Sequence, residues 1–155
     1  MSADLYLQLQ LLPSPSAGWR TELRAVAQAE NVGKALRALA NHALSTNQLT
    51  QLGRKITDLV AAGVQLEGFT PFRLGLVSNA TLDLLVPLLV ASAARQGILL
   101  ECIKGNFGQA MQDALDGNSR INQARCDAVL ISLDHRELVS LSEGQKDPVE
   151  GALMR

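Results

Sequence analysis

The sequence of 155 residues has few cysteines, few aromatic residues and no excess of either charge. Its two cysteines, Cys102 and Cys126, are too few for a disulfide framework, and their spacing fits no metal motif. We therefore expect them to be small buried hydrophobic residues in a reducing cytosol. A net charge of −1 with scattered Lys and Arg gives no electrostatic reason to expect binding to nucleic acid or to an anionic membrane.

Long hydrophobic runs are also missing. The longest apolar stretch, residues 84–91, is far shorter than the roughly 20 residues of a membrane-spanning helix, and no basic segment introduces a signal peptide. We expect a cytoplasmic protein without membrane contact. A hydrophobic content of 47% with 3% aromatics predicts a core made mostly of Leu, Val, Ile and Ala.

The first half of the chain changes from strand to helix periodicity. Residues 5–11 alternate Leu with Tyr or Gln, which predicts a half-buried strand at the edge of a sheet. Between residues 18 and 63, three apolar stripes at helical spacing predict three short helices. Asn31 is a possible cap for the second helix, and Ser45 or Thr46 for the third. We expect Trp19 to be a packing anchor.

Three apolar runs follow, at residues 74–77, 98–103 and 128–133, each ending in small or polar residues. A long apolar helix pattern separates the first two runs, and a shorter amphipathic pattern separates the last two. The alternation of strand and helix predicts a parallel sheet with crossover helices. The predicted fold class is therefore α/β: a small, mostly parallel sheet preceded by a short helical segment.

The two crossover helices differ in their apolar patterns. Thr81 is a possible cap for the first, which has almost no polar face and should be deeply buried. Pro87 either kinks this helix or lies in the first turn of a helix that begins later. The second helix has an apolar stripe at Phe107, Ala110, Met111, Ala114 and Leu115 and ends at Gly117.

We expect three segments along the chain. Residues 1–68 hold the N-terminal strand and the helical segment, residues 69–140 form the α/β module, and residues 141–155 have the composition of a linker or tail. The short sheet suggests one module of a longer protein.

Candidate site residues lie where the predicted strands end, because parallel α/β sheets bind ligands beyond the carboxyl ends of their strands. Ser78 lies in a strand-to-helix turn, where nucleophiles of α/β enzymes are often found, but its neighbours match no nucleophile motif. Asn79 either donates to an oxyanion or tolerates the tight turn, and the turn is the simpler reading. His135 is either a general base or a solvent-facing residue at a strand end, with Asp134 capping the next turn.

The loop after the second strand, Gly105-Asn106-Phe107-Gly108, resembles a small anion-binding loop at a helix N-terminus. It lacks the Lys-Ser/Thr of a phosphate-binding P-loop and the spacing of a dinucleotide fingerprint. No Asp-x-Asp motif opens a strand, so we expect no metal site in this chain and no cofactor.

Several motifs, taken together and in their order along the chain, resemble the N-terminal region of FkbH-like proteins. Those proteins are multi-domain members of the HAD superfamily from polyketide and related biosynthetic clusters. The motifs are residues 76–83 (Leu-Val-Ser-Asn-Ala-Thr-Leu-Asp), 107–109 (Phe-Gly-Gln), Asp116 followed by Ser119, 126–127 (Cys-Asp) and 133–138 (Leu-Asp-His-Arg-Glu-Leu).

The resemblance, over about residues 70–140, implies a flavodoxin-like three-layer fold similar to that of SGNH (GDSL) hydrolases. In the family this region precedes a HAD domain that dephosphorylates an activated glycerate and loads a glyceryl group onto an acyl carrier protein. By position, Ser78 corresponds to the hydrolase nucleophile and Gly105 to an oxyanion-hole glycine. The chain departs from the hydrolases because no Asp precedes Ser78 and no Asp-x-x-His follows, and the HAD aspartates are absent from it.

Three functional hypotheses follow. The first is a module that is non-catalytic alone and acts with a HAD domain, in cis or in trans, by presenting substrate or docking an acyl carrier protein. The second is a degenerate SGNH-type esterase using Ser78 with His135 and, as ligand contacts, Asn79, Gly105, Asn106 and Asp134. The third is a protein-interaction module whose helical layer, residues 19–62, carries an exposed apolar patch.

Overall fold

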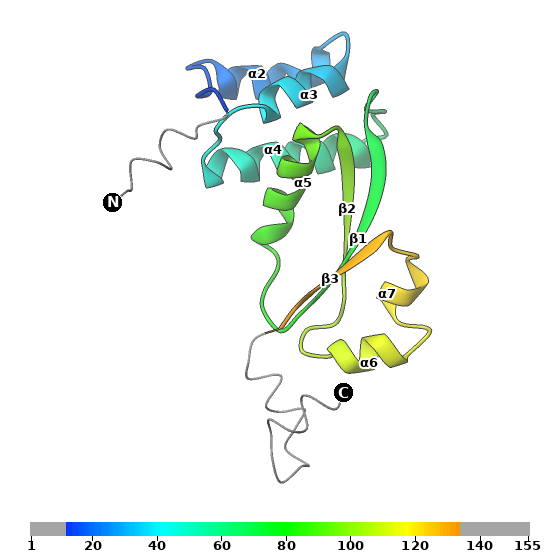
Figure 1. Ribbon diagram of the computed structural model, residues 1–155. Coiled ribbons are helices and arrows are strands. Elements are labelled where there is room, and N and C mark those ends of the chain that lie inside the picture. Colours follow the sequence, from blue (N-terminus) through cyan, green and yellow to red (C-terminus); the bar gives the residue numbers. More distant parts are fainter. Residues whose placement is uncertain (1–11, 134–155) are drawn as a thin grey trace, which may run out of the picture. The chain divides into compact units, whose positions relative to one another are not determined.

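A computed structural model of the chain describes residues 12–133 (Figure 1). By their contacts, the residues form two compact units. Among the described residues, we name 12–72 and 83–101 the helical unit, and 73–82 and 102–133 the strand unit. The described elements, in chain order, are α2 (Trp19–Ala25), η1 (Val26–Gln28), α3 (Val32–Ala40), α4 (Thr46–Ala61), β1 (Thr70–Ser78), α5 (Leu85–Arg95), β2 (Ile98–Lys104), α6 (Ala110–Leu115), α7 (Arg120–Gln123) and β3 (Ala128–Ser132).

The three strands form one sheet in the order β2-β1-β3. β1 and β3 are parallel, with a register that runs from Leu74 opposite Ala128 to Ser78 opposite Ser132. β1 and β2 also run the same way. The amide of Thr70 donates to the carbonyl of Gly97 at one end, and the amide of Gly105 donates to the carbonyl of Leu76 at the other. The predicted α/β class, with a small parallel sheet preceded by helices, is confirmed.

The strands that we predicted are present, with shifted ends. β1 begins at Thr70 rather than at residue 74, while β2 ends at Lys104 and β3 ends at Ser132. The predicted strand at residues 5–11 lies outside the described residues. In the part of the chain that the structure describes, no helix is both long enough and apolar enough to cross a lipid bilayer.

The caps and the packing residue that the sequence predicted for the first helices are present in the helical unit. The Asn31 side chain accepts from the amide of Lys34 at the start of α3, and Ser45 forms a capping box with Gln48 at the start of α4. Trp19 is 1% exposed, and its Nε1 donates to the carbonyl of Leu39 at 3.1 Å. Trp19 is therefore the packing anchor that we expected, with its one polar atom satisfied.

α5 differs from the prediction in both its start and its burial. It begins at Leu85, so Thr81 does not cap it, and Pro87 lies in its first turn. The reason is the missing N–H of proline, which is tolerated in the first turn of a helix but breaks a helix interior. Only Val90, Ala91 and Ala94 of α5 are buried, so the expectation of deep burial is wrong.

Close backbone contact holds α4 against α5 within the helical unit. Gly53 on α4 faces the carbonyl of Pro87 on α5, and a Cβ built on Gly53 would overlap that oxygen. The same holds for Gly33 on α3 and the carbonyl of Glu67. These two glycines are thus required by space rather than by backbone conformation.

The strand unit has apolar side chains on its surface. Of the predicted apolar stripe, Phe107 in the turn before α6 is 69% exposed and Leu115 at the end of α6 is 81% exposed, while Asp113 on α6 is only 4% exposed. The helix that this stripe predicted is present, but it begins at Ala110, after Phe107. All five residues of β3 are exposed, and α7 lies in a segment where the sequence indicated only a polar return.

Candidate functional site

The turn after β1 contains Ser78, the candidate nucleophile. Ser78 is 6% exposed, and its Oγ accepts a hydrogen bond from the amide of Ala80 at 3.0 Å. Its carbonyl accepts from the amide of Gly108 at 3.4 Å, which joins this turn to the loop after β2. Asn79 is half-buried beside it. The hydroxyl of Ser78 therefore stabilises the turn by accepting a backbone hydrogen bond, and it has little solvent access.

Gly105 has a geometric reason to be glycine. Its amide donates to the carbonyl of Leu76 at 2.9 Å, which holds it against β1. A Cβ at this position would lie 2.6 Å from Oδ2 of Asp113. A residue with any side chain would thus displace the Asp113 carboxylate.

Asn106 binds both oxygens of that carboxylate. Its amide donates to Oδ2 of Asp113 at 2.7 Å, and its side-chain Nδ2 donates to Oδ1 at 2.8 Å. The loop that we predicted as an anion site thus already holds a carboxylate of the same chain. Binding of an external anion by Gly105 and Asn106 stays a prediction.

Asp113 is a buried residue that the sequence did not single out. Its carbonyl accepts two hydrogen bonds, as its carboxylate does. Its carbonyl accepts from Oγ of Ser119 at 2.7 Å and from Nδ2 of Asn122 at 3.0 Å. We call Asn106, Asp113, Ser119 and Asn122 the Asp113 network. The available signal was an acidic residue placed among the apolar residues of a predicted helix, seven positions after Asn106.

The structure brings together Ser78 and the loop of Gly105 to Gly108, through the bond between the carbonyl of Ser78 and the amide of Gly108. His135 and Asp134 lie outside the described residues. The pairing of Ser78 with His135 therefore stays a prediction. Among residues 12–133, no three His, Cys, Asp or Glu side chains are gathered as metal ligands would be.

Both cysteines are free thiols and half-buried rather than fully buried. Burial raises the pKa of the Cys102 thiol above its ordinary value of 9.0. The neutral thiol is therefore favoured at pH 7, and Cys102 on β2 is a poor nucleophile.

No family model matches the chain, and no curated protein matches it. Among solved structures, the chain is similar to the N-terminal part of the protein BF1531 from Bacteroides fragilis, which contains a phosphatase domain and was crystallised as a complex with Mg. The TM-score is 0.55 at 16% identity, over 72% of this chain. The chain spans only 28% of the length of that structure. At this identity, the similarity establishes a shared fold.

Proposed function

We propose that this chain is an N-terminal α/β module that docks onto a HAD-type phosphatase domain, in cis or in trans. In this role it supports transfer of a glyceryl or related acyl group to an acyl carrier protein and is non-catalytic alone. The motif resemblance to FkbH-like proteins suggests the acyl chemistry. The shared fold with part of a protein that contains a phosphatase domain supports the association with such a domain.

The observation that carries the proposal is the exposed apolar surface of the strand unit. We call this surface the apolar edge; it comprises Phe107, Met111, Leu115, Val129, Leu130 and Ile131. β3 is the last strand of the described sheet, so its outer edge has no described strand beside it. Successive side chains of a strand point to opposite faces. Val129 and Ile131 therefore expose one face of β3, and Leu130 exposes the other.

Apolar side chains that are exposed on both faces of an edge strand forgo the free energy that their burial would contribute. Leu130 is 44% exposed and Ile131 is 64% exposed, and burying such side chains is worth about 1.5–3 kcal/mol each. Exposed apolar side chains beside a strand edge that no described strand pairs favour a protein partner and also promote aggregation. A docked domain would cover both the side chains and the strand edge.

The helical layer supports the third hypothesis less well. That hypothesis requires an exposed apolar patch on residues 19–62. Val60, 41% exposed, is the one large apolar residue that is clearly exposed in that range. A single exposed residue does not make a docking patch, so the partner surface that we propose is the apolar edge.

The test is association with a purified HAD-type phosphatase domain from a glyceryl-loading system, measured by isothermal titration calorimetry. We expect Ile131→Lys to weaken the complex at least about tenfold, because a charge would be buried without a partner. Val60→Lys is the matched control, since it places the same charge on α4, and we expect the affinity to stay within about twofold of that of the unchanged chain. Circular dichroism checks that both variants are folded.

A second readout follows glyceryl loading of an acyl carrier protein by the same phosphatase domain. Addition of the chain should raise the loading rate, and the Ile131→Lys variant should not. The docking proposal is overturned if the phosphatase domain does not bind the chain or if both variants bind equally well. Binding without any change in loading would leave the docking intact and remove the acyl-transfer role.

A further inference from the structure

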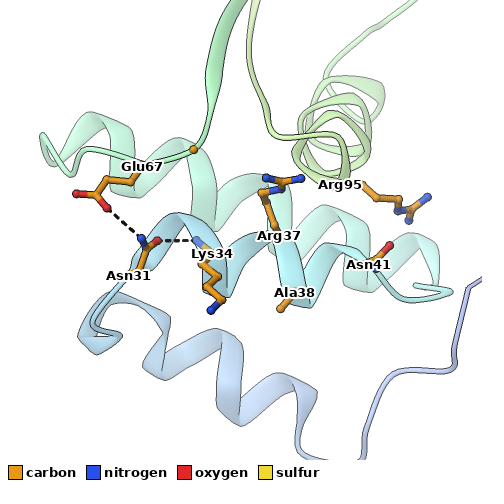
Figure 2. A pocket seen from close by; sticks show the side chains of 8 residues that line it. Asn31, Lys34, Arg37, Ala38, Asn41, Glu67 and Arg95 are labelled. Carbon is orange, nitrogen blue, oxygen red and sulfur yellow. Dashed lines mark hydrogen bonds between the residues drawn. The ribbon is translucent and has the colours of Figure 1, made fainter.

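The helical unit contains an open groove that the proposed function does not use. Its volume is about 570 Å³, and it is lined by Asn31, Lys34, Arg37, Ala38, Asn41, Glu67, Gly68 and Arg95 (Figure 2). This volume lies within the range of small-molecule sites, roughly 300–1,000 Å³. Three basic side chains and one acidic side chain line it, so its local charge is positive.

The acidic residue lies at one end and is already engaged. Oε2 of Glu67 accepts from Nδ2 of Asn31 at 3.0 Å, and Oδ1 of the same Asn31 side chain accepts from the amide of Lys34 at 2.7 Å. Figure 2 shows Glu67 directed toward Asn31 and away from the two arginines. Within the described residues, no carboxylate forms an ion pair with Arg37 or Arg95.

Backbone carbonyls hold Arg95 in place, and Arg37 packs against a glycine. Nε of Arg95 donates to the carbonyl of Ala40 at 3.0 Å, and its Nη2 donates to the carbonyl of His42 at 3.3 Å. A guanidinium has five N–H groups, so these two bonds leave donors available to a ligand. Arg37 lies against Gly97, where a Cβ would be 3.2 Å from its Cζ. The absence of a side chain at Gly97 therefore lets the guanidinium of Arg37 lie over the backbone.

We propose that this groove binds the phosphate group of a small metabolite, with Arg37 and Arg95 as its ligands. Two guanidinium groups in one groove match a doubly charged tetrahedral anion better than a singly charged carboxylate, because each presents paired donors to phosphate oxygens. The side-chain amide of Asn41 lines the same end of the groove and supplies a neutral donor. This site lies in the helical unit, so it is independent of the apolar edge.

The experiment is a titration of the ¹⁵N-labelled chain with inorganic phosphate, followed by NMR at constant ionic strength. We expect saturable shifts of the signals of Arg37, Asn41 and Arg95. Arg37→Ala should weaken phosphate binding about tenfold or more, since hydrogen bonds to charged groups are worth about 1.5–3 kcal/mol. Arg37→Lys should recover part of the affinity, because lysine keeps the charge but lacks the fork of donors. Acetate should bind more weakly than phosphate.

Arg20→Ala is the matched control, because Arg20 is an exposed arginine on α2 in the same unit and lies outside the groove. It removes the same charge and should leave the affinity within about twofold of that of the unchanged chain. Equal weakening by Arg20→Ala and Arg37→Ala would show non-specific attraction and overturn the proposal. So would shifts that never saturate, or shifts that map away from the groove.

Discussion

Asp113 shows how a single buried charge organises a loop. Its two carboxylate oxygens are bound by the amide and side chain of Asn106, and its carbonyl is bound by Ser119 and Asn122. A buried carboxylate is tolerated only where hydrogen bonds replace its hydration. The short helices α6 and α7, with six and four residues, have little intrinsic stability. The Asp113 network therefore joins them through hydrogen bonds from Ser119 and Asn122 to the carbonyl of Asp113.

We predict that Asp113→Ala lowers the free energy of unfolding by about 2–3 kcal/mol, because it removes the two hydrogen bonds that Asn106 donates to the buried carboxylate. Asp113→Asn should also destabilise, since an amide offers one acceptor oxygen where the carboxylate offers two. Urea unfolding followed by circular dichroism measures both.

Asp116→Ala is the control for this prediction. Asp116 is exposed, and its carboxylate accepts one local hydrogen bond, from the amide of Asn118 at 2.9 Å. Its replacement should cost about 1 kcal/mol or less. If Asp113→Ala and Asp116→Ala cost the same, the Asp113 network is not an organising feature of the loop.

At the scale of elements, the packing of α4 and α5 depends on the missing side chain of Gly53. In an isolated helix, Gly→Ala is stabilising by about 1 kcal/mol because of helix propensity. Here the added Cβ would overlap the carbonyl of Pro87 and force α5 away. The packing effect and the propensity effect therefore have opposite signs at this position.

We predict that packing is the larger effect and that Gly53→Ala lowers the free energy of unfolding by about 1–3 kcal/mol net. Gln51→Ala tests propensity alone, because Gln51 is exposed on the same helix. It should change stability by no more than about 0.5 kcal/mol. A gain in stability for Gly53→Ala would show that the two helices separate at little cost.

At the scale of the whole molecule, the strand unit holds both the candidate nucleophile and the apolar edge. Ser78 has almost no solvent access, and its Oγ already accepts from the amide of Ala80. Attack on an ester needs a hydroxyl that can reach the substrate and transfer its proton to a base. The described geometry of Ser78 therefore favours a turn residue over a nucleophile.

We predict that the purified chain shows no Ser78-dependent hydrolysis of 4-nitrophenyl acetate. Ser78→Ala and Ser92→Ala should have equal background rates, the second being an exposed serine on α5 in the other unit. Release of nitrophenolate followed by absorbance measures this. A rate that falls only in Ser78→Ala would support the esterase hypothesis over a non-catalytic module.

The sequence predicted much of the secondary structure because local signals determine it. The caps at Asn31 and Ser45 follow from short-range side-chain to backbone bonds. The alternation of strand and helix patterns also predicted the parallel sheet. The sequence placed Ser78, Gly105 and Asn106 where strands end, because such ends are recognisable along the chain. The function of these residues as a site stays a prediction.

Only the tertiary structure decided which side chains are buried. Periodicity indicated an apolar stripe on a helix over residues 107–115, but the fold exposes Phe107 and Leu115 and buries Asp113. The physical reason is that burial depends on partners distant in sequence: Asn106 and Ser119 satisfy the carboxylate, while no described element covers the apolar edge. Hydrophobic pattern therefore determined where elements form, and long-range contacts determined which of their faces are covered.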